Sequence, residues 1–283
     1  MTADPMRSRR LANNLMFGAT AVALTISLSV LFFILGYMVF KGASSLCLGF
    51  LVHLPAPVGQ PGGGIAHAIL GSFKLVALAS CIGIPFGVLG GVYLAEFAGI
   101  RSASVIRYCA DVMNGVPSIV TGIFAYTLVV LPMRHFSALA GSIALALIMI
   151  PLILRNTEDF IRLVPVSIRE AALALGVPRW KTVLRVVMPT AARGILTGAI
   201  LSVSRIAGET APLIFTAFGN NFWDKGELGP MASLPLVIFN YAISPYEEWH
   251  RQAWAAGTIL LLVVLAGNII ARVALKAPKG AVQ

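Results

Sequence analysis

Six stretches of this chain are each long and apolar enough to cross a lipid bilayer, and this feature constrains the fold most. A bilayer core about 30 Å thick needs roughly 20 apolar residues in each helical span. Because backbone polar groups in lipid must pair within the segment, these stretches predict α-helices. The predicted spans are residues 15–40, 75–95, 112–131, 136–154, 194–218 and 253–271. A seventh apolar stretch, 231–243, is too short to span and predicts an interfacial or re-entrant segment.

The low charge content leaves room for one membrane domain and for no sizeable soluble domain. Charged residues make up 11% of the chain, whereas a soluble domain carries about 25%. Three arginines before the first apolar stretch resemble the start of a signal peptide. The apolar core of a signal peptide is only about 7–15 residues long, and this stretch continues to Phe40. We therefore expect an uncleaved first span.

The net charge of the chain is +10, and the positions of its Lys and Arg residues predict how the chain is oriented in the membrane. With the N-terminus inside, fifteen of the 21 Lys and Arg residues fall on the cytoplasmic side. They are three in the N-terminal tail, Arg101 and Arg107, seven from Arg155 to Arg193, and three in the C-terminal tail. Such an excess follows the positive-inside rule. It predicts that both termini are cytoplasmic, with membrane lipid and not nucleic acid as the surroundings.

Two charged residues, Arg205 and Glu209, lie inside the fifth predicted span. Arg205 is eleven residues past Gly194, about 16 Å along a helix and so near mid-membrane. A charge at that depth costs roughly 2.5–3.5 kcal/mol and must face a partner or water. Glu209, four residues on, lies on the same helical face and can pair with Arg205. The pair either locks helix packing or lines a hydrated anion path, and the second interpretation is favoured because intramembrane charges mostly mark functional sites.

The third predicted span carries a polar stripe. Asn114, Ser118 and Thr121 are spaced at i, i+4 and i+7, which places them on one helical face. This face either lines the same path or forms hydrogen bonds between helices.

Residues 167–189 form a charged, helix-forming segment between apolar stretches. Ser167 and Glu170 have the spacing of a capping box at a helix start, and Gly176 suits a helix end with positive φ. Pro178 fits the first turn of a second short helix, which Pro189 would end. We expect an exposed elbow that transmits movement from a soluble partner. The alternative is a helix lying on the bilayer with its arginines reaching the headgroups.

The sequence contains no recognisable motif for nucleotide binding, metal binding or catalysis. Without any Gly-Lys dipeptide it has no phosphate-binding loop, so nucleotide hydrolysis would take place on another chain. His, Cys and carboxylate residues show no metal-ligand spacing, and no nucleophile–base pair lies at membrane depth. We therefore predict no catalytic residue, no metal site and no cofactor in this chain, which is not an enzyme.

The elbow segment resembles the EAA loop of permeases from binding-protein-dependent ABC importers. Glu170-Ala171-Ala172, then Gly176, then Met188-Pro189 stand in that family's order and spacing. In the family this loop docks into a cytoplasmic ATPase subunit. The resemblance therefore implies that Glu170, Ala171 and Gly176 are ATPase-docking residues.

A narrower resemblance is to the permease subunits of phosphate ABC importers. It is carried by Gly208-Glu209-Thr210-Ala211-Pro212 and its continuation to Ala217, by Gly115 to Gly122, and by Ile84-Pro85. It covers about residues 65–275, which we expect to form the permease domain. Residues 1–64 would then be a cytoplasmic tail, the first span and an extracytoplasmic loop, and residues 276–283 a cytoplasmic tail.

The resemblance implies an all-α polytopic bundle of six transmembrane helices with the type I (MetI-like) importer permease fold, in the inner membrane. Such a subunit forms half of a path for inorganic phosphate. Its implied partners are a related second permease subunit, two ATPase subunits carrying ATP and Mg²⁺, and an extracytoplasmic phosphate-binding protein. The alternatives are transport of another oxyanion, sulfate or molybdate, and a phosphate-sensing scaffold that does not transport. The residues predicted to line the path are Arg205, Glu209, Thr210, Asn114 and Ser118.

Overall fold

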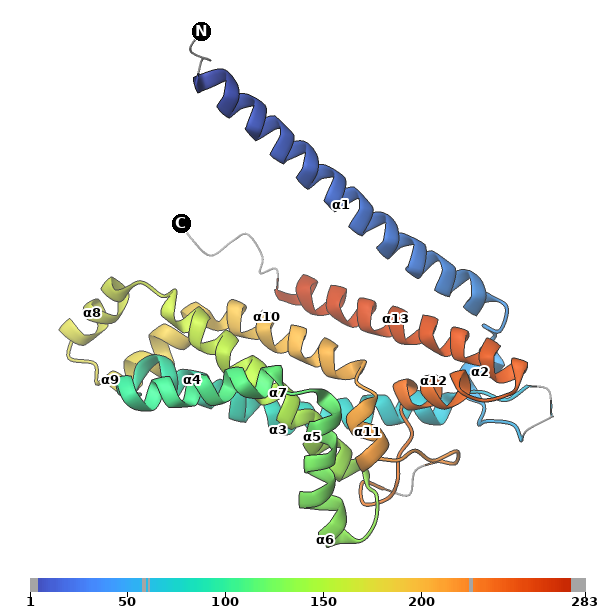
Figure 1. Ribbon diagram of the computed structural model, residues 1–283. Helices are drawn as coiled ribbons and strands as arrows, with labels where there is room; N and C mark the ends of the chain where they lie inside the picture. Colours follow the sequence, from blue (N-terminus) through green and yellow to red (C-terminus); the bar gives the residue numbers. More distant parts are fainter. Residues whose placement is uncertain (1–4, 58–59, 61, 224–225, 276–283) are drawn as a thin grey trace.

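The structure is a computed structural model and describes the chain except residues 1–4, 58–59, 61, 224–225 and 276–283, so the predicted tail 276–283 lies outside it. The described residues form helices and no strand (Figure 1). The helices are α1 (Pro5–Ala43), α2 (Leu48–Val52), α3 (Ala66–Glu96), α4 (Ile100–Gly115), α5 (Ser118–Ala125), α6 (Leu131–Met133), α7 (Ala138–Arg162), α8 (Val166–Ala174), α9 (Arg179–Thr182), α10 (Met188–Ala207), α11 (Ala211–Thr216), α12 (Leu234–Ala242) and α13 (Glu247–Leu275), with π-helical turns η1 (Tyr126–Val130) and η2 (Val183–Val187).

Five helices in the described part of the chain are long and apolar enough to cross a membrane, and a bent pair of helices makes a sixth crossing possible. The pair, residues 100–115 and 118–133, bends by 104°. The five continuous helices cover residues 9–43, 66–96, 138–162, 179–207 and 247–273. The predicted all-α membrane architecture is confirmed, with five continuous spans and one bent pair of helices that can serve as a sixth.

The third predicted span, 112–131, is divided between two helices. α4 ends at Gly115 and α5 begins at Ser118, so the break falls at Pro117. Proline lacks the amide hydrogen that continues a helix, and it pushes the residue before it, here Val116 (φ −68°, ψ 130°), into an extended conformation.

The fifth span also differs at both ends from the prediction of 194–218. It begins at Arg179, because Pro189 does not end the second elbow helix and instead lies in the first turn of α10. The π-helical turn η2 ends two residues before Pro189, and its wider winding relieves the clash that a proline ring makes with the preceding turn. The span ends at Ala207, before Gly208.

The core forms where α3 packs against α7. Gly83, Gly87 and Gly91 repeat every four residues along α3 and are buried. A Cβ atom on Gly87 would lie 2.7 Å from the Cβ atom of Ile153 on α7. The glycines therefore let the two backbones approach closely, as small residues do between membrane helices.

Helix α1 diverges from the bundle toward its N-terminal end and approaches α13 only near its C-terminal end (Figure 1). There Gly42 lies against Thr258, and the Thr258 hydroxyl donates to the Met38 carbonyl at 3.2 Å. The Tyr37 and Trp254 rings meet edge to face at 5.5 Å between centroids. The rest of α1 keeps its apolar side chains exposed.

Candidate functional site: the translocation path and the coupling elbow

The second half of the bent pair and the short helix that follows the fifth span meet at α5 and α11. A Cβ atom on Gly122 of α5 would lie 2.6 Å from the Pro212 Cα atom of α11, so the two short helices are in backbone contact. Ser118 is the first residue of α5, and Thr210 directly precedes α11. The contact therefore brings the two predicted path segments, which are some 90 residues apart in sequence, onto one pair of packed helices.

Arg205 and Glu209 form the expected ion pair, and it is loose. The Arg205 Nε atom lies 3.9 Å from the Glu209 Oε1 atom, beyond hydrogen-bond distance. The Arg205 side chain is 48% exposed and that of Glu209 is 17% exposed. Arg205 lies in the last turn of α10, and Glu209 lies in the break that follows. The guanidinium is thus held near a counter-charge but keeps donors for another partner.

The predicted polar stripe on the third span is divided by the bend. Asn114 lies on α4, whereas Ser118 and Thr121 lie on α5, so the three side chains do not share one helical face. The Asn114 Oδ1 atom is buried, and among the described residues it has no hydrogen-bond partner. A hollow of about 360 Å³ lies beside the break and is lined by Met113, Val116, Val120, Thr121, Phe124 and Leu147.

The elbow consists of α8 and the first turns of the fifth span. Gly176, between them, has a φ of +76°, as predicted for a helix end. The predicted capping box is wrong, because α8 begins at Val166 after Pro165 and Ser167 lies inside its first turn. Proline at the boundary pre-sets the helix start without a side-chain cap.

Two arginines attach the elbow to the end of α3. The Arg169 Nε atom lies 3.0 Å from the buried carboxylate of Glu96, and the other nitrogens of this guanidinium donate to the carbonyls of Ile161 and Val164. The Arg179 guanidinium donates to the Glu96 carbonyl and lies over the Phe97 ring. The elbow is therefore connected to the membrane helices by charge-assisted hydrogen bonds, which are stronger than neutral ones.

The predicted docking residues Glu170, Ala171 and Gly176 are all exposed. Leu175 beside them is 84% exposed, and Trp180 is 56% exposed. An exposed apolar surface rimmed by charges is typical of a protein–protein contact.

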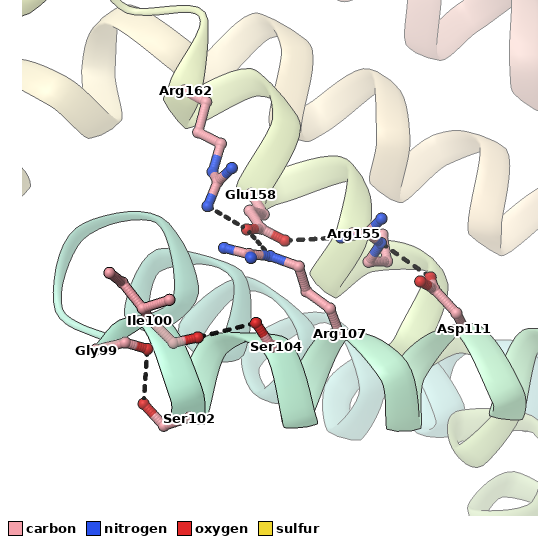
Figure 2. Close-up of polar contacts among 9 residues, drawn as sticks. All are labelled: Gly99, Ile100, Ser102, Ser104, Arg107, Asp111, Arg155, Glu158 and Arg162. Atoms are coloured by element: carbon pink, nitrogen blue, oxygen red, sulfur yellow. Dashed lines mark hydrogen bonds and ion pairs between the residues drawn. The ribbon is translucent and has the colours of Figure 1, made fainter.

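A cluster of charges between α4 and α7 was not predicted from the sequence. Glu158 is 1% exposed and forms ion pairs with Arg107 at 2.6 Å, Arg155 at 3.0 Å and Arg162 at 2.9 Å, as Figure 2 shows. Arg155 also reaches Asp111 at 3.1 Å. We call these five residues the arginine cluster. Its sequence signal was the spacing i, i+3 and i+7 of Arg155, Glu158 and Arg162 on one helical face.

In the described portion of the chain, no three His, Cys, Asp or Glu side chains lie close enough together to hold a metal ion.

Comparison with known proteins shows which family the sequence matches. Residues 83–277 match the family described as binding-protein-dependent transport system inner membrane component. The chain is 43% identical to the phosphate transport system permease protein PstA of Yersinia pestis, over 95% of this chain and 94% of that protein. It is 42% identical to the protein of the same name from Haemophilus influenzae, over 93% and 94% of the two chains.

Solved structures share the fold at low sequence identity. A bacterial alginate ABC transporter, in complex with an alginate pentasaccharide-bound periplasmic protein, contains a chain with a TM-score of 0.66 at 13% identity, covering 95% of this chain and 99% of that one. The MetNI methionine ABC transporter in inward-facing conformations gives 0.58 at 18% identity, over 75% and 98%. These likenesses confirm the predicted type I importer permease fold. With the matches in sequence, they show that the chain belongs to the binding-protein-dependent transport system inner membrane components and, within them, to the PstA permeases.

Proposed function

We propose that this chain forms half of the path through which an ATP-driven importer carries inorganic phosphate across the inner membrane. The observation that carries the proposal is the identity of 43% with a phosphate transport system permease over 95% of the chain. The loose Arg205–Glu209 pair, at 3.9 Å, supplies chemistry that suits the cargo. A guanidinium stays charged at any physiological pH and presents N–H groups in a fork that matches phosphate oxygens.

The path residues have distinct roles in this proposal. Arg205 contacts the anion transiently, and the Arg205–Glu209 ion pair forms again when the anion leaves. Because Glu209 repels an anion, it keeps the contact weak, which transport requires. Thr210 and Ser118, at the starts of α11 and α5, add hydroxyl donors, and the side-chain NH2 group of Asn114 adds an N–H donor on the α4 side of the break.

The elbow couples movement of the path helices to ATP binding and hydrolysis on the ATPase subunits. Glu170, Ala171 and Gly176 dock on an ATPase subunit, and the Arg169 and Arg179 contacts with the end of α3 carry its movement to the membrane helices. The assembly contains a related second permease subunit, two ATPase subunits that hold ATP and Mg²⁺, and an extracytoplasmic phosphate-binding protein. This chain itself performs no bond chemistry and needs no cofactor.

The test is uptake of labelled phosphate at micromolar concentration by cells that lack this chain and other phosphate importers. The cells are re-supplied with wild type, Arg205→Ala, Arg205→Lys or Gly176→Leu, and membrane levels of each variant are checked. We expect wild type to restore uptake, Arg205→Ala and Gly176→Leu to abolish it at normal levels, and Arg205→Lys to restore part of it.

Competition with sulfate and molybdate distinguishes the cargo. Inhibition of uptake by unlabelled phosphate alone supports the proposal. Equal inhibition by sulfate or molybdate would move the assignment to that oxyanion. Unchanged phosphate uptake in the deletion strain would contradict transport and favour a sensing scaffold.

A further inference from the structure

The arginine cluster holds more positive than negative charge. Three guanidinium groups meet two carboxylates, those of Glu158 and Asp111. The central carboxylate of Glu158 is 1% exposed and forms ion pairs with all three arginines. One positive charge therefore remains without a carboxylate inside the cluster.

The arginines also keep donors that reach the surface. The side chains of Arg107, Arg155 and Arg162 are 26%, 31% and 52% exposed. Each guanidinium carries five N–H donors, and the contacts with Glu158 and Asp111 use only part of them. The Asp111 side chain is 55% exposed, so it can leave Arg155 at little cost, because exposed ion pairs contribute little to stability.

The position of the cluster connects it to the proposed path. Arg107, Asp111 and Asn114 lie at i, i+4 and i+7 on α4, and therefore on one helical face. Arg107 is about 10 Å from Asn114 along the helix axis. α4 begins at Ile100, four residues after Glu96, to which Arg169 and Arg179 of the elbow are bound. The polar face thus runs from the break at Pro117 toward the predicted cytoplasmic end.

We propose that Arg107, Arg155 and Arg162, held together by Glu158, bind a phosphate oxyanion at the inner end of α4. The proposal rests on the proposed function where the ligand is inorganic phosphate leaving the path; the phosphate of an anionic lipid headgroup offers the same chemistry. The anion accepts from Arg162 and Arg107 and takes the place of Asp111 on Arg155. Phosphate and guanidinium groups form charge-assisted, often bidentate hydrogen bonds.

Glu158 is a positioning residue in this site. Without its carboxylate, three like charges would lie within a few ångströms of one another and would separate. Its negative charge also keeps the site weak, because it repels the anion that the arginines attract. A weak site suits the inner end of an import path, where the ion must be released.

The experiment uses the complete importer in proteoliposomes, with ATP enclosed so that only molecules with inward-facing ATPase subunits work. Labelled phosphate and the binding protein are supplied outside, and unlabelled inorganic phosphate is enclosed at increasing concentration and constant ionic strength. Occupation of the inner site from inside competes with release of the transported ion. We expect internal phosphate to slow uptake. We expect Arg162→Gln to raise the half-inhibitory concentration about tenfold, as for loss of a charge-assisted contact.

Three further variants make the test specific. Asp111→Asn removes the carboxylate that competes for Arg155, so the half-inhibitory concentration should fall, a change of opposite sign. Arg101→Gln removes a positive charge from the same helix outside the cluster and should change nothing. Arg162→Lys keeps the charge and should fall between wild type and Arg162→Gln.

The lipid arm separates the two sources of phosphate. Liposomes are made with and without phosphatidylglycerol. If Arg162→Gln shifts inhibition by internal phosphate in both, the ligand is the free ion. If the variant abolishes only a dependence on phosphatidylglycerol, the ligand is the headgroup. Equal inhibition of wild type, Arg162→Gln and Asp111→Asn in both lipids would overturn the site and leave the transport function intact. Absence of phosphate uptake by wild type would overturn both.

Discussion

The buried carboxylate of Glu96 is the residue through which the elbow is attached to α3. It accepts from Arg169 at 3.0 Å, and its backbone carbonyl accepts from Arg179. Glu96→Gln keeps the shape and removes the charge, while Arg169 keeps its two carbonyl partners. We expect a loss of about 1–3 kcal/mol of stability, as for a buried hydrogen bond to a charged group. Thermal unfolding of the purified complex should show a lower Tm.

The control for this change is Glu247→Gln, which removes a carboxylate whose side chain is 93% exposed, in the first turn of α13. Its Tm should equal that of wild type, since an exposed charge contributes little to stability. Equal Tm values for the Glu96 and Glu247 variants would mean that the Arg169–Glu96 contact does not hold the elbow.

The sequence allowed prediction of contacts between near neighbours and not of contacts between distant residues. The Arg205–Glu209 pair followed from helical spacing, and the structure places the two side chains 3.9 Å apart. Glu158 escaped prediction because its partner Arg107 is 51 residues away on another helix. Only the packing of α4 on α7 brings them together, and single-sequence periodicity carries no information on that packing.

The α3–α7 contact provides a test with two glycines on the same helix. A Cβ atom on Gly87 would lie 2.7 Å from the Ile153 Cβ atom and 3.1 Å from the Ile150 carbonyl oxygen, groups fixed to the backbone. One on Gly90 would lie 2.9 Å from the Leu154 Cδ1 atom, the far end of a flexible side chain. Gly87→Ala should therefore cost about 1–3 kcal/mol through overpacking.

Gly90→Ala should be neutral or slightly stabilising, because alanine favours a helix by about 1 kcal/mol over glycine and Leu154 can rotate away. Apparent Tm in detergent and the yield of assembled complex measure both variants. A Gly90→Ala variant as unstable as Gly87→Ala would show that α3 tolerates no side chain along this whole side.

The turn of the elbow depends on the backbone of Gly176. Its φ is +76°, and a side chain there would meet open space, with no atom within 4 Å. The cost of substitution is therefore conformational: a β-branched residue is strained at positive φ, whereas asparagine tolerates it. We expect Gly176→Val to lose most phosphate uptake and Gly176→Asn to keep most of it. If both variants fail at normal membrane levels, the ATPase requires the bare glycine surface, and φ is not the cause.

The residues at which helices begin and end were harder to predict than the existence of the helices. Each apolar stretch forms helix, since lipid leaves the backbone little choice. The breaks at Pro117 and Gly208 and the continuation through Pro189 depended on local winding that hydropathy does not encode. Pro132 and Pro189 both follow π-helical turns, whereas Pro117 follows none and separates two helices bent by 104°. Pro85 and Pro151 lie inside the continuous helices α3 and α7, so the presence of a proline does not by itself decide where a helix breaks.

For the whole molecule, the orientation in the membrane is predicted from the distribution of Lys and Arg residues, and the chain's own cysteines can test it. Cys47 follows α1 and Cys109 lies on α4, and both are exposed. The positive-inside rule places Cys47 outside and Cys109 in the cytoplasm. Variants that keep one cysteine each allow the two positions to be labelled separately. A membrane-impermeant maleimide added to intact cells should then label the Cys47 variant, and added to inverted vesicles it should label the Cys109 variant.

Detergent-solubilised protein is the control, because both cysteines must react there if neither is covered by a partner subunit. Labelling of Cys109 in intact cells would reverse the topology and place the elbow outside, where no ATPase could reach it. The arginine cluster would reverse with it, since Arg107 lies two residues before Cys109 on α4. One labelling pattern thus tests the side of the membrane on which both the ATPase-docking residues and the inner phosphate site must lie.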